Sequence, residues 1–233
     1  MPFFYYANDG GMWIVAILAA ILASIASVRV NSTFKKYSTK INSRGLTGRT
    51  CAEAVLRSAG ITDVRIESVS GNLTDHFDPK AKVIRLSDAV YNSSSVSALG
   101  VASHEAGHAV QHEVGYFPIK IRQAIIPFCQ IGSNLALPLI LLGLLVSVTG
   151  LCELGLILFS LSTLFQLVTL PVEFNASRRA LDYLENGAGL TRDEMSGAKK
   201  VLSAAAMTYV AALAVALVNL LRLIAIVNNS RRR

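Results

Sequence analysis

Four long apolar stretches restrict the folds that this sequence can adopt. They run over residues 12–28, 125–148, 151–171 and 207–227. Their lengths are close to the roughly 20 residues with which a helix crosses the hydrocarbon core of a bilayer. Only a few residues separate the second stretch from the third, which predicts a transmembrane helical hairpin. We therefore expect an α-helical multi-pass membrane protein.

The first stretch has two interpretations, a signal peptide or a retained membrane anchor. Signal peptides begin with a positively charged segment, whereas residues 1–11 contain neither Lys nor Arg. We expect residues 1–28 to form an uncleaved N-terminal transmembrane anchor.

The distribution of basic residues predicts an orientation in the membrane. The sequence holds 22 Lys and Arg against 15 Asp and Glu, which gives a net charge of +7. Six basic residues follow the first stretch: Arg29, Lys35, Lys36, Lys40, Arg44 and Arg49. The positive-inside rule places this segment in the cytoplasm, and the hairpin returns the chain to the same side. If the fourth stretch also crosses, the three arginines at 231–233 lie outside, so the sequence leaves that crossing open.

A basic chain can also bind nucleic acid, but the pattern here favours another partner. The charges flank membrane stretches and lack interleaved aromatic residues, so solvated cytoplasmic loops explain them better than a nucleic-acid partner. The composition, 52% hydrophobic and 16% charged, indicates the lipid bilayer. Three cysteines without a CxxC pair exclude a disulfide framework and a thiolate zinc cluster.

The apolar stretches divide the chain into five segments. We expect an anchor (1–28), a cytoplasmic catalytic region (29–124), the transmembrane hairpin (125–171), a helix with a connecting loop (172–206), and a C-terminal apolar helix with a basic tail (207–233).

Local patterns predict the elements of the catalytic region. A capping-box pattern and a terminal glycine predict a helix over residues 50–60. Alternating apolar and polar residues predict strands over 64–69 and 81–87, joined as a hairpin by a tight turn. A second helix is expected to be capped within 92–95 and to continue to Glu113. The region should therefore be mostly helical α+β with a small β-hairpin.

The second helix carries an HExxH motif, His104-Glu105-Ala106-Gly107-His108. Helix residues four apart share a face, so both imidazoles can bind one metal ion. Glu105 is then placed to take a proton from a water molecule that the metal activates. The alternative is a helix with two polar surface histidines. Ala106 and Gly107 favour the metal site, because small side chains let another backbone approach closely.

A catalytic zinc site needs a third protein ligand. His112 shares the helix face, but a straight helix puts it roughly 12 Å from His104 along the axis. We expect it near the substrate or metal, or as a polar surface residue. His76 is either a turn residue or part of the wall of the site. Glu173 is the best candidate, because the hairpin returns it to the same side and small residues follow on its helix face. Its alternative is a helix N-terminal carboxylate stabilised by the dipole.

Residues 73–79, 84–87, 101–112 and 171–181 together resemble the bacterial neutral zinc metallopeptidase family. The resemblance extends in order over nearly the whole chain, apolar stretches included. It implies a zinc-dependent metallopeptidase, a hydrolase of the bacterial plasma membrane that acts on peptides or proteins. It also implies that His104, His108 and Glu173 bind Zn²⁺ and that Glu105 is the catalytic base.

A more distant similarity connects the chain to the CAAX-prenyl and heat-shock membrane metallopeptidases, which have a gluzincin-like HExxH helix. Those families often have Asp where this chain has Ser177. A carboxylate partner for a ligand histidine is therefore absent here or is supplied by another residue.

The leading hypothesis is hydrolysis of peptide bonds by zinc-activated water with Glu105 as general base. Arg179, His112, His76 and Tyr183 are candidates for stabilising the oxyanion. A strand such as residues 82–86 could also pair with an extended substrate.

Two other functions compete with this hypothesis. An intramembrane site-2-type protease carries its HExxH motif within an apolar span, whereas here a long polar segment precedes it. The second is a membrane scaffold, or pseudoprotease, that binds zinc structurally or not at all, and a fourth protein ligand such as His76 or His112 would favour it. The intact Glu105 argues against the scaffold.

Overall fold

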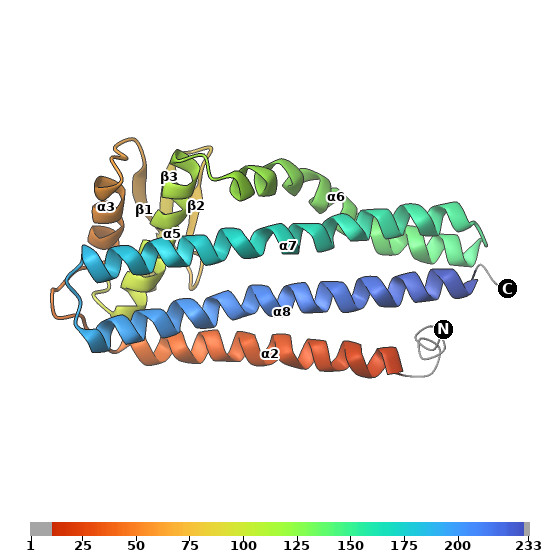
Figure 1. Ribbon diagram of the computed structural model, residues 1–233, viewed down its shortest axis with the longest axis horizontal. Coiled ribbons are helices and arrows are strands. Elements are labelled where there is room, and N and C mark those ends of the chain that lie inside the picture. Colours follow the sequence, from red (N-terminus) through yellow and green to blue (C-terminus); the bar gives the residue numbers. More distant parts are fainter. Residues whose placement is uncertain (1–10, 231–233) are drawn as a thin grey trace. The chain divides into compact units, whose positions relative to one another are not determined.

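The structure is a computed structural model that describes residues 11–230, and helices dominate it (Figure 1). Residues 1–10 of the expected anchor and the basic tail 231–233 lie outside the described residues. The elements are α2 (Gly11–Ser38), α3 (Gly48–Ser58), β1 (Arg65–Val69), β2 (His76–Asp78), β3 (Val83–Ser87), α4 (Asp88–Tyr91), α5 (Val96–Glu113), α6 (Phe117–Leu145), α7 (Thr149–Asn186) and α8 (Arg192–Ser230).

The chain divides into two compact units. The first unit comprises the N-terminal part up to residue 26, residues 121–170 and the C-terminal part from residue 208. The second unit comprises residues 27–120 and 171–207, and it holds the sheet, α3 and α5. Each of the four long helices contributes residues to both units.

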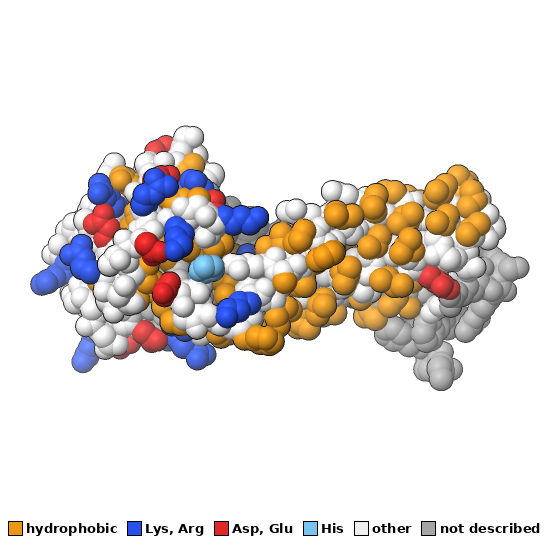
Figure 2. Space-filling model, turned by 90° about the horizontal axis from the view of Figure 1, so that it is seen from above, with side chains coloured by type: hydrophobic (Ala, Val, Ile, Leu, Met, Phe, Trp, Pro, Cys, Tyr) orange, Lys and Arg blue, Asp and Glu red, His pale blue; other side chains and the backbone are white. Residues whose placement is uncertain are grey.

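Four helices, α2, α6, α7 and α8, are long and apolar enough to cross a membrane. Many of their large apolar side chains are exposed, among them Ile17, Leu145 and Ile157. Figure 2 shows hydrophobic side chains over much of the first unit, and Lys, Arg, Asp and Glu side chains gathered over the second. Exposed apolar surface of this extent is typical of a lipid-facing surface. The expected mostly helical architecture with four apolar helices is confirmed.

The helices α6 and α7 pack closely within the first unit. Residues 146–148 join them, and the Ser133 and Ser162 hydroxyls lie 2.9 Å apart. A Cβ atom on Gly155 would lie 2.7 Å from the carbonyl oxygen of Ala136. Small residues at such positions let membrane helices approach each other, and α6 and α7 form a helical hairpin.

The sheet of the second unit differs from the expected hairpin. Its strand order is β1-β3-β2, in which β1 runs parallel to β3 and β2 runs antiparallel to it. The prediction that 64–69 and 81–87 form a hairpin is therefore wrong. The hairpin partner is β2, whose three residues are too few to show an alternating pattern. The Asp78 carboxylate accepts hydrogen bonds from the N–H groups of Lys80 and Ala81, which form the turn into β3.

The central position of β3 also corrects the expected substrate strand. Both of its edges are already paired, β1 on one side and β2 on the other. An extended peptide therefore cannot add to residues 82–86, and the edges of this sheet are β1 and β2.

The helices of the second unit begin at identifiable caps. The capping box of α3 is formed by Thr47 and Thr50, so the helix starts earlier than the expected residue 50. The α5 helix begins as expected, because the Ser95 side chain accepts a hydrogen bond from the N–H of Ala98. Apolar side chains of α3, β3 and α5 form a shared core, including Val55, Ile84 and Ala102. This core fixes the position of α5.

The three cysteines are buried free thiols. Burial raises the pKa of Cys51 to about 12, so this thiol stays protonated and unreactive at neutral pH.

Candidate metal centre

Two histidines of α5 lie one helical turn apart and face the same space. The ring centroids of His104 and His108 are 4.7 Å apart, and their planes meet at 80°. On another face of α5, Ala102, Ala106 and Ala109 are buried in the core. The apolar packing of that face therefore orients the two imidazoles.

The helix α7 brings a carboxylate to both imidazoles. Glu173 Oε2 lies 3.1 Å from His104 Nε2 and 3.5 Å from His108 Nε2. The Glu173 side chain is only 3% exposed. Among residues 11–230, this is the group of three His, Cys, Asp or Glu side chains whose ligand atoms all lie within 4.8 Å of one another.

A glycine in the motif permits this close approach of α7. A Cβ atom on Gly107 would lie 2.8 Å from the carbonyl oxygen of Ala176 and 3.4 Å from its Cα. Real Cβ atoms do not approach a backbone oxygen so closely, so any larger residue would push the helices apart. The expectation that Gly107 admits another backbone is confirmed.

Each imidazole has a hydrogen-bond partner on its second nitrogen. Ser177 Oγ lies 3.2 Å from His104 Nδ1, and Gln111 Oε1 lies 3.0 Å from His108 Nδ1. The Gln111 amide nitrogen donates to the carbonyl oxygen of Val172 at 2.7 Å and to Asn175 Oδ1 at 3.0 Å. Partners of this kind fix the tautomer and the ring orientation of metal-binding histidines.

The orientation of the Gln111 amide determines the His108 tautomer. Because the amide nitrogen must face the Val172 carbonyl, the amide oxygen faces His108 and accepts a hydrogen bond from Nδ1–H. The lone pair of His108 Nε2 is therefore available on the side of Glu173. A buried carboxylate beside such a nitrogen needs a positive charge between them.

A proton or a metal ion can supply that charge. Burial disfavours the protonated form of His108, but the hydrogen bond and the charge of Glu173 outweigh burial, so the pKa of His108 is raised. Zinc binds imidazole nitrogen and carboxylate oxygen at about 2.0–2.2 Å. The observed separations of 3.1 and 3.5 Å lie within the reach of two ligands on one such ion. The donor set therefore fits zinc.

The other candidate residues are distributed unevenly around this centre. Glu105 is half-buried, and its negative charge acts on His108. Arg179 donates from Nε to Asn175 Oδ1 at 2.8 Å, and through Asn175 it reaches Gln111. His112 is exposed and packs edge-on against the Phe77 ring, with centroids 6.0 Å apart.

His76 is held elsewhere in the second unit. It is exposed on β2, where its Nδ1 lies 2.8 Å from the carbonyl oxygen of Thr74 and its Nε2 lies 3.4 Å from Arg85 Nη1. Neither His76 nor His112 belongs to the group of close ligand atoms formed by His104, His108 and Glu173.

Sequence reasoning missed Gln111 and Asn175. Both carry amide side chains that hold other residues rather than groups typical of catalysis. Gln111 follows His108 by three positions, which puts the two side chains on one face of the helix. That spacing was the available signal, whereas the contact with Asn175 depends on how α5 and α7 pack.

Comparison with known proteins gives a family. The family model described as "Putative neutral zinc metallopeptidase" matches residues 12–228. A curated relative from Bacillus subtilis (strain 168), named "Putative membrane protease YugP", is 46% identical over 221 residues, which cover 94% of this chain and 98% of that protein. No solved structure matches the chain.

Proposed function

This chain belongs to the family of neutral zinc metallopeptidases, and we propose that it is a membrane-bound peptidase whose zinc site is formed by His104, His108 and Glu173. The observation that carries this proposal is the convergence of two imidazoles and one carboxylate within 4.8 Å. Two of the donors come from α5 and the third from α7. Ser177 and Gln111 hold the imidazoles for this role.

The number of ligands favours a catalytic site over a structural one. Structural zinc sites have four protein ligands, whereas catalytic sites have three and keep one position for water or substrate. Bound zinc would acidify a water molecule and polarise the scissile carbonyl. A fourth ligand would favour a zinc-binding scaffold, and neither His76 nor His112 lies in the group.

Glu105 serves as the general base in this proposal. Its carboxylate takes the proton of the attacking water and later gives it to the leaving amine, so one group acts in both steps. Its position next to His104 and three residues before His108 would place it near a water molecule bound at the proposed site. Peptide or protein chains are the substrates that this chemistry accepts.

We place the site on the cytoplasmic side of a bacterial plasma membrane. Basic residues gather after the apolar part of α2, from Arg29 to Arg49, and such residues stay in the cytoplasm. The relative from Bacillus subtilis is itself named a membrane protease. The orientation can be tested with a cysteine introduced at the exposed Lys80 and a thiol reagent that does not cross membranes. Labelling of this cysteine in intact cells would contradict a cytoplasmic site.

Two variants test the proposed function. Purified protein in detergent should hold one zinc ion per chain, and Glu173→Ala should lose it or bind it far more weakly. Glu105→Gln should retain the zinc and lose hydrolysis of labelled casein by about 100-fold or more. Full zinc affinity in Glu173→Ala removes this ligand from the proposal, and full activity in Glu105→Gln removes the base. If the wild type is purified without zinc and does not bind added zinc, the proposal that the protein is a zinc peptidase is wrong.

A further inference from the structure

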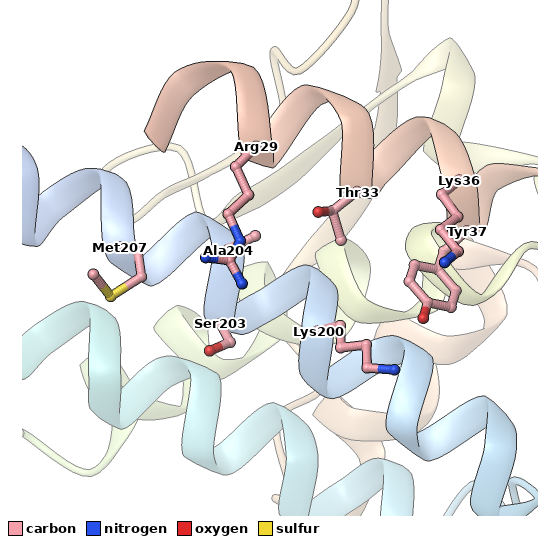
Figure 3. Close-up of a pocket in the computed structure, with 8 residues that line it drawn as sticks. All are labelled: Arg29, Thr33, Lys36, Tyr37, Lys200, Ser203, Ala204 and Met207. Atoms are coloured by element: carbon pink, nitrogen blue, oxygen red, sulfur yellow. The ribbon is translucent and has the colours of Figure 1, made fainter. Parts of the chain in front are cut away.

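The second unit contains a pocket of about 440 Å³ whose residues take no part in the metal centre. It is lined by Arg29, Thr33, Lys36 and Tyr37 of α2 and by Lys200, Ser203, Ala204 and Met207 of α8. Figure 3 shows Arg29 and Thr33 projecting from α2 toward the α8 residues Ser203 and Ala204. The two helices therefore share the walls of the pocket.

The pocket concentrates positive charge. Arg29, Lys36 and Lys200 all line it, and its walls contain no Asp or Glu. None of these three residues forms a salt bridge with another described residue. Asp193, at the start of α8, forms its salt bridge with Lys40 and acts on Lys200 only through its charge. Three cations that form no salt bridge within the described part of the chain make the pocket suited to an anion.

The sequence around the pocket places it at the end of two apolar segments. Arg29 is the first Lys or Arg in the chain and follows the uncharged residues 12–28. Lys200 immediately precedes the uncharged residues 201–221. In helices that cross a bilayer, this transition coincides with the headgroup region, where the lipid phosphates lie. Each helix thus carries a cation of the pocket where its uncharged segment ends.

The pocket also has an apolar end. Ala204 and Met207 line it on α8, and Met207 is exposed. Thr33 and Ser203 line the pocket together with the cations, and their hydroxyl groups can donate hydrogen bonds to phosphate oxygens. A phosphate with acyl chains attached matches charged and apolar walls together, whereas free phosphate matches only the charged one.

We propose that this pocket binds the phosphate group of an anionic phospholipid, with Arg29 and Lys200 as the principal contacts. Basic pockets between membrane helices are typical sites for anionic headgroups. The proposal does not depend on zinc or on peptidase activity, so it can fail or hold independently of the proposed function.

Lipid binding to the delipidated full-length protein tests the proposal. Native mass spectrometry in a neutral detergent would measure binding of dioleoylphosphatidylglycerol, dioleoylphosphatidylcholine and inorganic phosphate. We expect the wild type to bind the anionic lipid at least about tenfold more tightly than the zwitterionic one. Equal affinity for both lipids overturns the proposal. If inorganic phosphate at the same concentration displaces the anionic lipid, the claim that the bound phosphate belongs to a lipid is wrong.

A matched pair of double variants separates the pocket from general surface charge. Arg29→Gln with Lys200→Gln removes two pocket cations, whereas Lys35→Gln with Lys199→Gln removes two exposed neighbours that do not line the pocket. The pocket variant should lose about tenfold or more in affinity for the anionic lipid, and the control should keep wild-type affinity. An equal loss in both contradicts a specific site.

A variant that keeps all three cations tests whether weaker lipid binding reflects the pocket itself or a loss of folding. Ser203→Leu narrows the pocket at an exposed position, and its thermal unfolding in detergent reports whether the protein is still folded. With a wild-type melting temperature, it should bind the anionic lipid several-fold more weakly. Wild-type lipid affinity in both Ser203→Leu and the pocket double variant overturns the proposal.

Discussion

Ser177 Oγ lies 3.2 Å from His104 Nδ1, at the position where more distant membrane metallopeptidases often carry Asp. A hydroxyl group thus occupies the place expected for a carboxylate. The second proposed ligand histidine, His108, likewise meets a neutral partner in Gln111. Both imidazoles are therefore oriented by uncharged groups, and the negative charges at the centre come from Glu173 and Glu105.

The hydroxyl of Ser177 should contribute to zinc affinity by orienting His104. We expect Ser177→Ala to weaken zinc binding by about tenfold, since partners of ligand histidines have effects of this size. Ser177→Asp should keep or raise the affinity, because a carboxylate accepts the same hydrogen bond from Nδ1–H. Competition with a zinc-binding dye measures both. Identical affinities in all three proteins would show that the contact does not orient the imidazole.

Gln111 should have a larger effect than Ser177, because it joins His108 to two groups of α7. Gln111→Met keeps the approximate volume and removes every hydrogen bond of the amide. We expect a 10- to 100-fold loss of zinc affinity, roughly the range known for such partners. His112→Ala is the matched control, since His112 lies next in the helix and is exposed. If His112→Ala weakened zinc binding as much as Gln111→Met, the assignment of Gln111 would be wrong.

The close contact of α5 with α7 predicts a penalty for any side chain at position 107. In Gly107→Ala the new methyl group meets the Ala176 carbonyl oxygen, so α7 must move and carry Glu173 with it. We expect a loss of about 1–3 kcal/mol in the free energy of unfolding and weaker zinc binding. Thermal unfolding in detergent, with and without zinc, measures this.

Gly100→Ala provides the comparison within the same helix. Its new Cβ would have its nearest neighbour at 3.8 Å, an ordinary contact. Because alanine favours helix more than glycine, this variant should be neutral or more stable by up to about 1 kcal/mol. Equal destabilisation by the two substitutions would show that the contact with Ala176 is not the cause.

Asp75 predicts a pH dependence of stability. Burial raises the pKa of Asp75, although hydrogen bonds from the Ser87 N–H and hydroxyl groups act to lower it. A raised carboxyl pKa means that the folded state holds the proton more tightly than the unfolded state. The contribution of Asp75 to stability therefore falls as the pH rises from the ordinary value of 3.8 through the folded pKa.

Asp75→Asn should remove this dependence while keeping both contacts with Ser87. The amide oxygen can accept from the N–H group, and the amide nitrogen can donate to the hydroxyl. Relative to Asp75→Asn, the melting temperature of the wild type should therefore decrease as the pH rises from about 4 toward 7. A wild type that gains stability relative to the variant over this range contradicts the raised pKa.

The elements predicted correctly are those with a local signal in the sequence. Such signals are the length of the four apolar stretches, the capping residue Ser95 and the helical spacing of the HExxH motif. The sheet was predicted incorrectly because β2 has three residues and because parallel pairing of β1 with β3 depends on contacts distant in the sequence.

The proposed metal ligands could be predicted from the sequence, but the residues that orient them could not. The spacing of His104 and His108 on a helix is local. The prediction of Glu173 rested in part on the return of the hairpin to the same side and for the most part on the family resemblance. The hydrogen bonds that hold the imidazoles were not predictable, because Gln111 reaches Val172 and Asn175 across the packing of two helices. Side chains that only orient others carry no chemical signature of their own.

The helix α7 carries both the third apolar stretch, which ends at Pro171, and Glu173 in one continuous element. The position of Glu173 after this stretch sets the order in which the proposed ligands are synthesised. When the ribosome has synthesised α5, the chain contains His104 and His108 but not Glu173. Glu173 is added only after α6 and the apolar part of α7 have been synthesised. Peptidase activity from the proposed site would then begin only once both helices of the hairpin have been synthesised.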